Sequence, residues 1–258
     1  MHVRELFDLT GKTAIVTGGS RGLGFQMASA LGEAGAALTL TARKADVLEH
    51  AAEQLRGHGV RALAVPGNVI QAGAAEAVVA RTLEEFGRVD ILINNAGTTW
   101  GASVLDMPLD AWQKVLETNV TGTFLMVQAV GRAMIDAGRG GKIVNVASVA
   151  GLVGTDAGVL DAIGYSTSKG AVIALTRDLA VKWARHGITV NAVAPGFFPS
   201  KMTRWLIEHR GEAILGTVPM GRLGGEDDLK GAAVFLASRA SDFVTGQVLV
   251  VDGGATAW

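Results

Sequence analysis

The chain has 258 residues, of which 49% are hydrophobic, with a formal net charge of -1 and no cysteine. This length suits one α/β domain, and the lack of cysteine excludes disulfides, thiol catalysis and thiolate metal sites. Acidic and basic residues are interspersed, so we expect no nucleic-acid partner and no membrane partner. The five histidines show no metal-ligand spacing, and we expect no metal site.

The N-terminal residues 1–8 carry charges where a secretory signal needs an apolar run. No stretch approaches the roughly 18 consecutive apolar residues of a membrane-spanning helix. We therefore expect a cytoplasmic protein.

Strands and helices are predicted to alternate along the chain. Apolar, partly β-branched runs predict strands at residues 13–17, 37–41, 61–65, 90–93, 142–146, 188–193 and 247–251. Helical spacing predicts helices at residues 25–34, 45–56, 71–86, 110–137, 165–185 and 226–237. This alternation predicts right-handed βαβ units and a doubly wound parallel sheet.

A glycine-rich loop, Gly18-x-x-x-Gly22-x-Gly24, separates the first strand from the first long helix. Glycines allow the backbone to turn sharply and to approach a pyrophosphate, which binds at the helix N-terminus. The setting favours a dinucleotide site, and the alternative is a glycine-rich turn that binds nothing.

The second predicted strand ends in Thr41-Ala42-Arg43. An enzyme that prefers NAD usually has an acidic residue at this place, where it binds the ribose 2′-hydroxyl. Arg43, together with Arg21 of the glycine loop, can instead pair with a 2′-phosphate. The sequence therefore predicts NADP(H), and the alternative is two exposed surface arginines.

Tyr165 is the only tyrosine of the chain, and Lys169 follows one helical turn later on the same helix face. A neighbouring ammonium group stabilises a phenolate, so we expect the Tyr165 pKa to fall below about 10. Such a phenol suits proton transfer near neutral pH. The alternative is a buried aromatic residue beside a lysine that extends to the surface.

Further motifs follow the ends of the later strands: Asn94-Asn95-Ala96-Gly97, Ala147-Ser148 and Pro195-Gly196. In open parallel sheets, ligands bind at this carboxyl edge. Together with Thr17-Gly18-x-x-x-Gly22-x-Gly24, Asn119 and Tyr165-x-x-x-Lys169, these motifs make the chain resemble the short-chain dehydrogenase/reductase family over nearly its whole length. The resemblance implies a single Rossmann-like domain over residues 1–258, with helices on both faces of a seven-stranded parallel sheet.

The resemblance also implies an oxidoreductase that transfers a hydride between NADP(H) and a ketone or secondary alcohol. By matching position, Tyr165 is the acid/base, Ser148 polarises the carbonyl, Lys169 assists the tyrosine and holds the ribose, and Asn119 anchors a proton relay. The implied cofactor-binding residues are Gly18, Ser20, Arg21, Gly22, Leu23, Gly24, Arg43, Asn68, Val69, Asn95, Ala96, Gly97, Tyr165, Lys169, Pro195, Gly196, Phe198 and Ser200.

Three features depart from the family pattern. Ser200 stands where a threonine is common, and it keeps the hydroxyl. Asn68 stands where an aspartate usually accepts a hydrogen bond from the adenine amino group, so this contact lacks a charge. The loop at residues 151–164 is longer than usual, and we expect it to change the wall of the substrate pocket. A substrate lid is expected at about residues 197–225.

The resemblance within the family is divided. Residues 6–11, 231–236 and 247–254 resemble gluconate 5-dehydrogenases, whereas residues 195–203 resemble 3-oxoacyl reductases. An apolar set in the expected substrate-facing segments favours a 3-oxoacyl-type or other apolar oxo substrate: Trp100, Val153, Leu160, Ile163, Phe197 and Trp205. Lys201, Arg204 and Arg210 are either a solvated helix face or a site for an anionic group.

Two alternatives remain. One is a keto-sugar-acid or polyol dehydrogenase that resembles gluconate 5-dehydrogenases. The other is a non-catalytic cofactor-binding scaffold, which we expect to lack one of Asn119, Ser148, Tyr165 and Lys169. The family commonly assembles through its long helices and C-terminal strand, so we expect a homotetramer or homodimer.

Overall fold

The computed structural model describes residues 1–257, and its centre is an all-parallel sheet of seven strands. The strands are β1 (Thr13–Thr17), β2 (Ala37–Ala42), β3 (Ala62–Pro66), β4 (Ile91–Asn94), β5 (Gly141–Val146), β6 (Ile188–Pro195) and β7 (Val248–Val251). Their order is β3-β2-β1-β4-β5-β6-β7. The predicted α/β fold with a doubly wound parallel sheet is confirmed.

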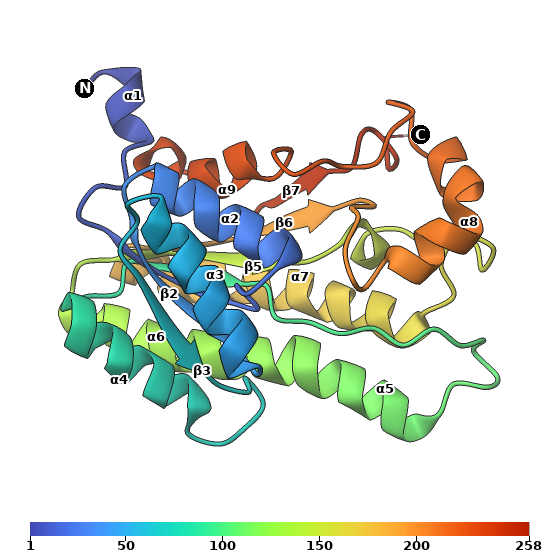
Figure 1. Cartoon of the computed structure of the whole chain (residues 1–258), viewed down its shortest axis with the longest axis horizontal. Coiled ribbons are helices and arrows are strands. Elements are labelled where there is room, and N and C mark those ends of the chain that lie inside the picture. Colours follow the sequence, from blue (N-terminus) through green and yellow to red (C-terminus); the bar gives the residue numbers. More distant parts are fainter. Residues whose placement is uncertain (258) are drawn as a thin grey trace.

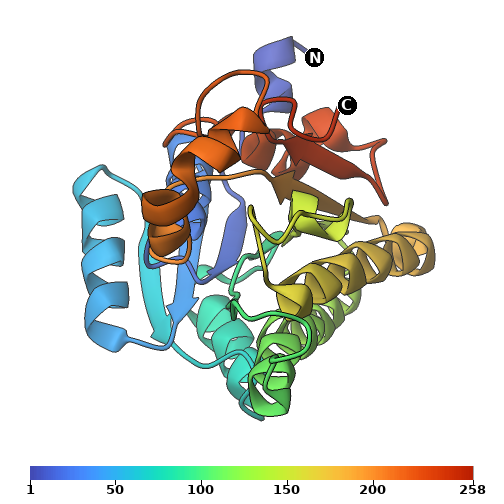
Figure 2. The same cartoon turned by 90° about the vertical axis from the view of Figure 1, so that its right-hand side faces the viewer.

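Helices cover both faces of this sheet (Figure 1). They are α1 (Val3–Leu6), α2 (Gly22–Glu33), α3 (Ala45–Gly57), α4 (Ala74–Phe86), α5 (Leu109–Leu116), α6 (Gly122–Ala137), α7 (Ile163–Trp183), α8 (Arg204–Gly216) and α9 (Lys230–Ala237). Short 3₁₀ turns lie at Val149–Gly151, Ala184–His186 and Arg239–Ser241. Figure 2 shows α3 (light blue) and α7 (gold) on opposite sides of the molecule.

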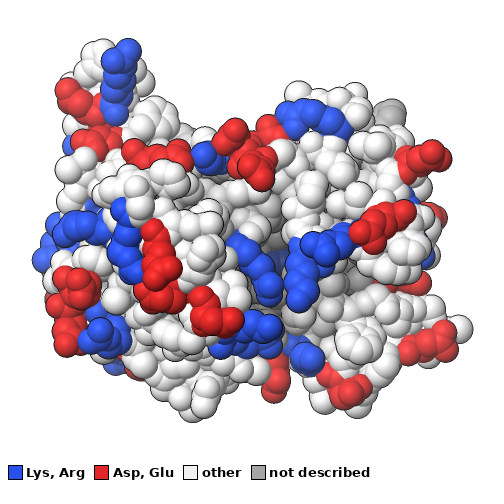
Figure 3. Space-filling view, viewed as in Figure 1, with Lys and Arg blue, Asp and Glu red and all other residues white. Residues whose placement is uncertain are grey.

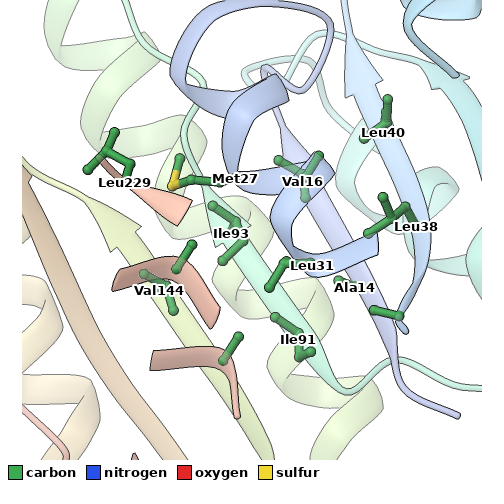
Figure 4. Packing of buried hydrophobic residues seen from close by; sticks show 14 of the residues in the cluster. Ala14, Val16, Met27, Leu31, Leu38, Leu40, Ile91, Ile93, Val144 and Leu229 are labelled. Atoms are coloured by element: carbon green, nitrogen blue, oxygen red, sulfur yellow. The ribbon is translucent and has the colours of Figure 1, made fainter. Parts of the chain in front are cut away.

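The core has one layer on each side of the sheet. Figure 4 shows the layer under α2, where Met27 and Leu31 pack against Val16, Leu38 and other strand residues. The layer on the other face lies under α4, α6 and α7. Because both faces are covered, every residue of β1 is buried, which explains why the strands are apolar runs without alternation.

The long helix predicted at residues 110–137 is interrupted. A π-helical turn, Glu117–Thr121, separates α5 from α6, and the Gly122 amide donates to the Glu117 carbonyl five residues earlier. Such turns occur often at functional sites, and this one contains Asn119.

The last helix begins at Lys230, four residues later than predicted. Asp228 instead accepts hydrogen bonds from the Gly225 amide at 2.7 Å and from Nη2 of Arg222 at 3.0 Å. This side chain stabilises a turn before the helix, because its carboxylate bonds to groups that a helix would place elsewhere.

The strand order reverses between β1 and β4, since the chain builds outward through β2 and β3 and then returns. Ligands of open parallel sheets bind beyond the carboxyl ends of the strands at such a point. Figure 1 shows α8 and the C-terminal end of the chain at the end of the sheet to which the arrow of β6 points. Within residues 1–257 no helix is both long and apolar enough to cross a membrane.

Candidate active site

The loop between β1 and α2 has the backbone that its glycines predict. Gly18 and Gly22 have φ angles of 64° and 56°, in the left-handed region that favours glycine. A Cβ atom at Gly24 would overlap the Gly18 carbonyl oxygen. The first turn of α2 has no side-chain cap, so its amide groups are left for another acceptor.

The segment that follows β4 forms hydrogen bonds with the end of β1 and the start of the glycine loop. Nδ2 of Asn95 donates to the carbonyls of Thr17 and Gly18 at 3.0 and 3.2 Å, and the backbone amides of Asn95 and Ala96 donate to Oγ1 of Thr17 at 3.0 and 2.9 Å. The Asn95 side chain therefore positions the glycine loop, which is a role that the sequence alone does not reveal.

Arg21 and Arg43, the arginines expected at a 2′-phosphate, are exposed, and they follow the carboxyl ends of β1 and β2. Neither Arg21 nor Arg43 forms an ion pair with any residue in the described chain 1–257. Figure 3 shows one face of the molecule, with a hollow in its middle and Lys and Arg side chains gathered around the hollow. Asn68 and Val69 follow β3, and Val69 packs against Gly122, where a side chain would collide with it.

Tyr165 and Lys169 lie one turn apart near the start of α7, as predicted. The Tyr165 ring is half-buried, whereas Lys169 is 5% exposed. Nζ of Lys169 donates to the Val146 carbonyl at 2.6 Å and lies 5.6 Å from the centre of the Tyr165 ring. Ser148 follows β5, and its hydroxyl also accepts from the Ala150 amide at 3.2 Å.

The predicted fall in the Tyr165 pKa is wrong for this structure. Burial raises the Tyr165 pKa above its usual value near 10, and a hydrogen bond with Ser148 offsets part of that rise. Burial also lowers the Lys169 pKa from 10.5 to about 8. Desolvation disfavours the charged form of both groups, and Nζ of Lys169 donates to the Val146 carbonyl.

Asn119 connects the loop after β4 to α7. It is 1% exposed, and its amide exchanges two hydrogen bonds with the Thr98 backbone, at 2.8 and 2.9 Å. Its Nδ2 also donates to Oγ of Ser168 at 2.9 Å, and that hydroxyl donates to the Tyr165 carbonyl at 2.7 Å. Asn119 thereby braces the turn of α7 that carries Tyr165 and Lys169. Sequence reasoning missed Ser168, although its place one turn from Tyr165 was a usable signal.

A pocket of about 240 Å³ opens beside Ser148 and Tyr165. Its walls come from the loop after β5, from the segment after β6 that includes α8, and from the C-terminal tail. The lining residues are Thr99, Ser148, Val149, Ala150, Val153, Gly154, Thr155, Asp156, Val159, Leu160, Tyr165, Gly196, Phe197, Met202, Thr203, Leu206, Thr217, Ala255 and Thr256.

Half of the expected apolar set lines this pocket, namely Val153, Leu160 and Phe197. Trp100, Ile163 and Trp205 do not line it, and the Trp205 ring stacks on His209 with centroids 4.4 Å apart. Ala255 and Thr256 were not predicted, because no local pattern indicates where a chain end will fold.

The remaining residues predicted to bind the cofactor follow β6. Pro195 ends the strand and Gly196 lines the pocket. Phe198 is buried against Gly224, and Oγ of Ser200 lies 3.0 Å from Oγ1 of Thr203. Of these side chains, Phe198 and Ser200 are occupied by contacts within the chain, so any contact with a ligand involves the backbone or the free side of the hydroxyl.

A model of the short chain dehydrogenase family matches residues 12–211. The chain belongs to the short-chain dehydrogenase family. It is 39% identical to the 5-keto-D-gluconate 5-reductase of Escherichia coli K12 over 98% of both chains. It is 38% identical to the 3-oxoacyl-[acyl-carrier-protein] reductase of Synechocystis sp. over 95% of this chain and 97% of that one.

Its fold is also that of solved family members. The gluconate 5-dehydrogenase of Burkholderia cenocepacia, solved in complex with NADP and tartrate, has a TM-score of 0.94 and 37% identity over 100% of both chains. These likenesses confirm the predicted family and the enzyme class, an oxidoreductase of the short-chain type. The similar proteins divide between sugar-acid and acyl substrates, as the sequence motifs do.

Proposed function

We propose that the protein is an NADPH-dependent reductase that converts a ketone with an apolar substituent, of the 3-oxoacyl type, to the secondary alcohol. The same enzyme would catalyse the reverse oxidation. The observation that carries this proposal is the position of Ser148 and Tyr165 on one wall of a largely apolar pocket, with the buried Lys169 ammonium group behind them. Residues 197–225, which supply another wall, are the proposed substrate lid.

The residues present fit the dinucleotide. The uncapped N-terminus of α2 and the glycine backbone at Gly18–Gly24 can offer amide groups to its phosphates, and a side chain at Gly24 would collide with the Gly18 carbonyl and distort this loop. The exposed Arg21 and Arg43 can pair with a 2′-phosphate, and the Burkholderia relative was solved with NADP. The bound cofactor supplies the hydride.

The chain's own residues supply the proton and the orientation. Arrival of a hydride at a carbonyl carbon leaves negative charge on the oxygen, so a donor aimed at that oxygen stabilises the transition state. The Ser148 hydroxyl orients the oxygen, and the Tyr165 hydroxyl transfers its proton to it. The raised Tyr165 pKa keeps this proton in place at neutral pH, which suits reduction.

Lys169 and Asn119 act behind the tyrosine. Nζ of Lys169 lies 5.6 Å from the centre of the Tyr165 ring, and it would hold the ribose hydroxyls of the bound cofactor. Asn119 joins the first turn of α7 to the Thr98 segment through its hydrogen bonds to Ser168 and Thr98. All four expected catalytic residues are present, which argues against a non-catalytic scaffold.

A second candidate is a keto-sugar-acid or polyol dehydrogenase. The 39% identity to the Escherichia coli 5-keto-D-gluconate 5-reductase favours it. The apolar lining of Val149, Val153, Leu160 and Phe197 favours the apolar ketone, because a polyol needs polar partners for each buried hydroxyl.

We further propose that residues 1–258 act as one domain and that the chain forms a homotetramer or homodimer. The outer surface of α6 and α7 carries the exposed side chains Phe124 and Val181, and a groove of about 360 Å³ lies between these helices. Apolar groups exposed together are typical of an interface between subunits. The free edge of β7 is a second candidate interface.

The test is a panel of ketones with NADPH and NADH, scored by kcat/KM. We expect NADPH to be preferred and 3-oxoacyl esters to exceed 5-ketogluconate. A preference for 5-ketogluconate would establish the second candidate, and no turnover of any ketone would favour the scaffold.

A further inference from the structure

The described lining of the substrate pocket contains a negatively charged side chain but no positively charged one. Among the lining residues of the described chain, Asp156 is the one with a charged side chain, and no Lys, Arg or His takes part. Oδ1 of Asp156 accepts from the Gly158 amide at 2.7 Å, and no hydrogen bond within residues 1–257 occupies Oδ2. The described lining therefore carries one negative charge, on the exposed side chain of Asp156, and no positively charged side chain.

Three threonine hydroxyls of the lining donate their protons in hydrogen bonds within the chain. Thr203 donates to the Phe198 carbonyl at 2.6 Å, Thr217 to the Ile214 carbonyl at 2.7 Å, and Thr256 to Oδ2 of Asp252 at 2.8 Å. A hydroxyl has one proton to donate. Toward the pocket these three side chains therefore offer methyl groups and acceptor oxygens, but no donors.

The basic residues of the lid do not line the pocket. Arg210 donates to the Ala157 carbonyl, so its guanidinium group joins α8 to the loop that carries Asp156. Lys201 and Arg204 are exposed and do not line the pocket. The expectation that these three side chains form a site for an anionic group thus has no support in the geometry of the pocket.

We infer that Asp156 determines specificity by charge: the substrate is a neutral ketone, such as a 3-oxo ester or thioester, and ketones that carry a carboxylate are rejected. This inference rests on the proposed function. A carboxylate placed in this pocket would lie near the Asp156 carboxylate and would gain no hydrogen-bond donor from Thr203, Thr217 or Thr256, and both effects disfavour its binding. The inference separates this chain from its sugar-acid relatives, since gluconates are anions.

The matched substrates are ethyl acetoacetate and acetoacetate, which present the same ketone with and without a negative charge. For unit charges about 6 Å apart at an effective dielectric constant of about 40, repulsion amounts to about 1.4 kcal/mol, or about tenfold in binding. The variant is Asp156→Asn, whose amide oxygen can still accept from the Gly158 amide. The control is Asp161→Asn, which removes the same charge from the same loop outside the pocket lining.

We expect the wild type to prefer the ester by at least about tenfold in kcat/KM. In Asp156→Asn, the ratio of kcat/KM for the ester to that for acetoacetate falls about tenfold, through a lower KM for acetoacetate, whereas Asp161→Asn changes this ratio by less than twofold. Equal use of both substrates by the wild type, or equal effects of the two variants, overturns the inference while leaving ketone reduction intact. If the wild type turns over no ketone at all, the proposed function fails and the inference falls with it.

Discussion

The buried Lys169 should make the cofactor-free protein more stable as the pH rises above neutrality. The substitution Lys169→Met should remove this pH dependence. Burial lowers the Lys169 pKa to about 8, against 10.5 for an exposed lysine. Between these values the unfolded chain binds more protons than the folded protein, so the contribution of Lys169 to stability rises with pH in that window. Below about pH 8 the folded protein must bury an ammonium group.

The magnitude follows from the size of the shift. A difference of about 2.5 pKa units corresponds to about 3 kcal/mol, of which about 2 kcal/mol is recovered between pH 7 and pH 9.5. Lys169→Met keeps most of the side-chain volume and cannot be protonated. From pH 7 to pH 9.5, the unfolding free energy of the wild type should therefore rise by about 2 kcal/mol relative to that of Lys169→Met.

The assay is urea unfolding of both proteins at pH 7 and pH 9.5 without cofactor. Lys182→Met is the matched control, because Lys182 is an exposed lysine on the same helix, paired with Asp178. Its difference from wild type should change by less than about 0.5 kcal/mol. A pH-independent difference for Lys169→Met would refute the assignment of a lowered pKa to this lysine.

Three further predictions concern the cofactor site and the assembly. Arg43→Ala should raise the KM for NADPH about tenfold or more and leave that for NADH within twofold, since the lost contact is to the 2′-phosphate; equal effects would contradict this contact. Gly24→Ala should weaken NADPH binding at least about tenfold in a fluorescence titration, because the added Cβ overlaps the Gly18 carbonyl; unchanged affinity in a folded variant would contradict the phosphate loop. Val181, 80% exposed on α7, should be buried between subunits, so Val181→Glu should lower the mass found by light scattering; an unchanged mass would exclude this face.

The sequence predicts most of the fold because its signals are local. Apolar runs, helical spacing and the glycine loop each depend on neighbouring residues, and the seven strands follow from them to within one or two residues. The place of Tyr165 and Lys169 on one face of α7 follows for the same reason.

Features that depend on distant contacts were missed or misjudged. The π-helical turn around Asn119 allows this side chain to bond to Thr98 and Ser168, which are far apart in sequence. The Tyr165 pKa depends on how deeply the surrounding chain buries it, which spacing does not reveal.

The most direct test of the central claim is the rate of NADPH oxidation by Tyr165→Phe with a ketone that the wild type reduces, measured beside the affinity of both proteins for NADPH. If the Tyr165 hydroxyl transfers the proton, the rate should fall by about 10²–10⁴-fold while the affinity for NADPH stays within about threefold. A variant that binds NADPH and keeps a rate within about tenfold of the wild type would show that the proton comes from elsewhere.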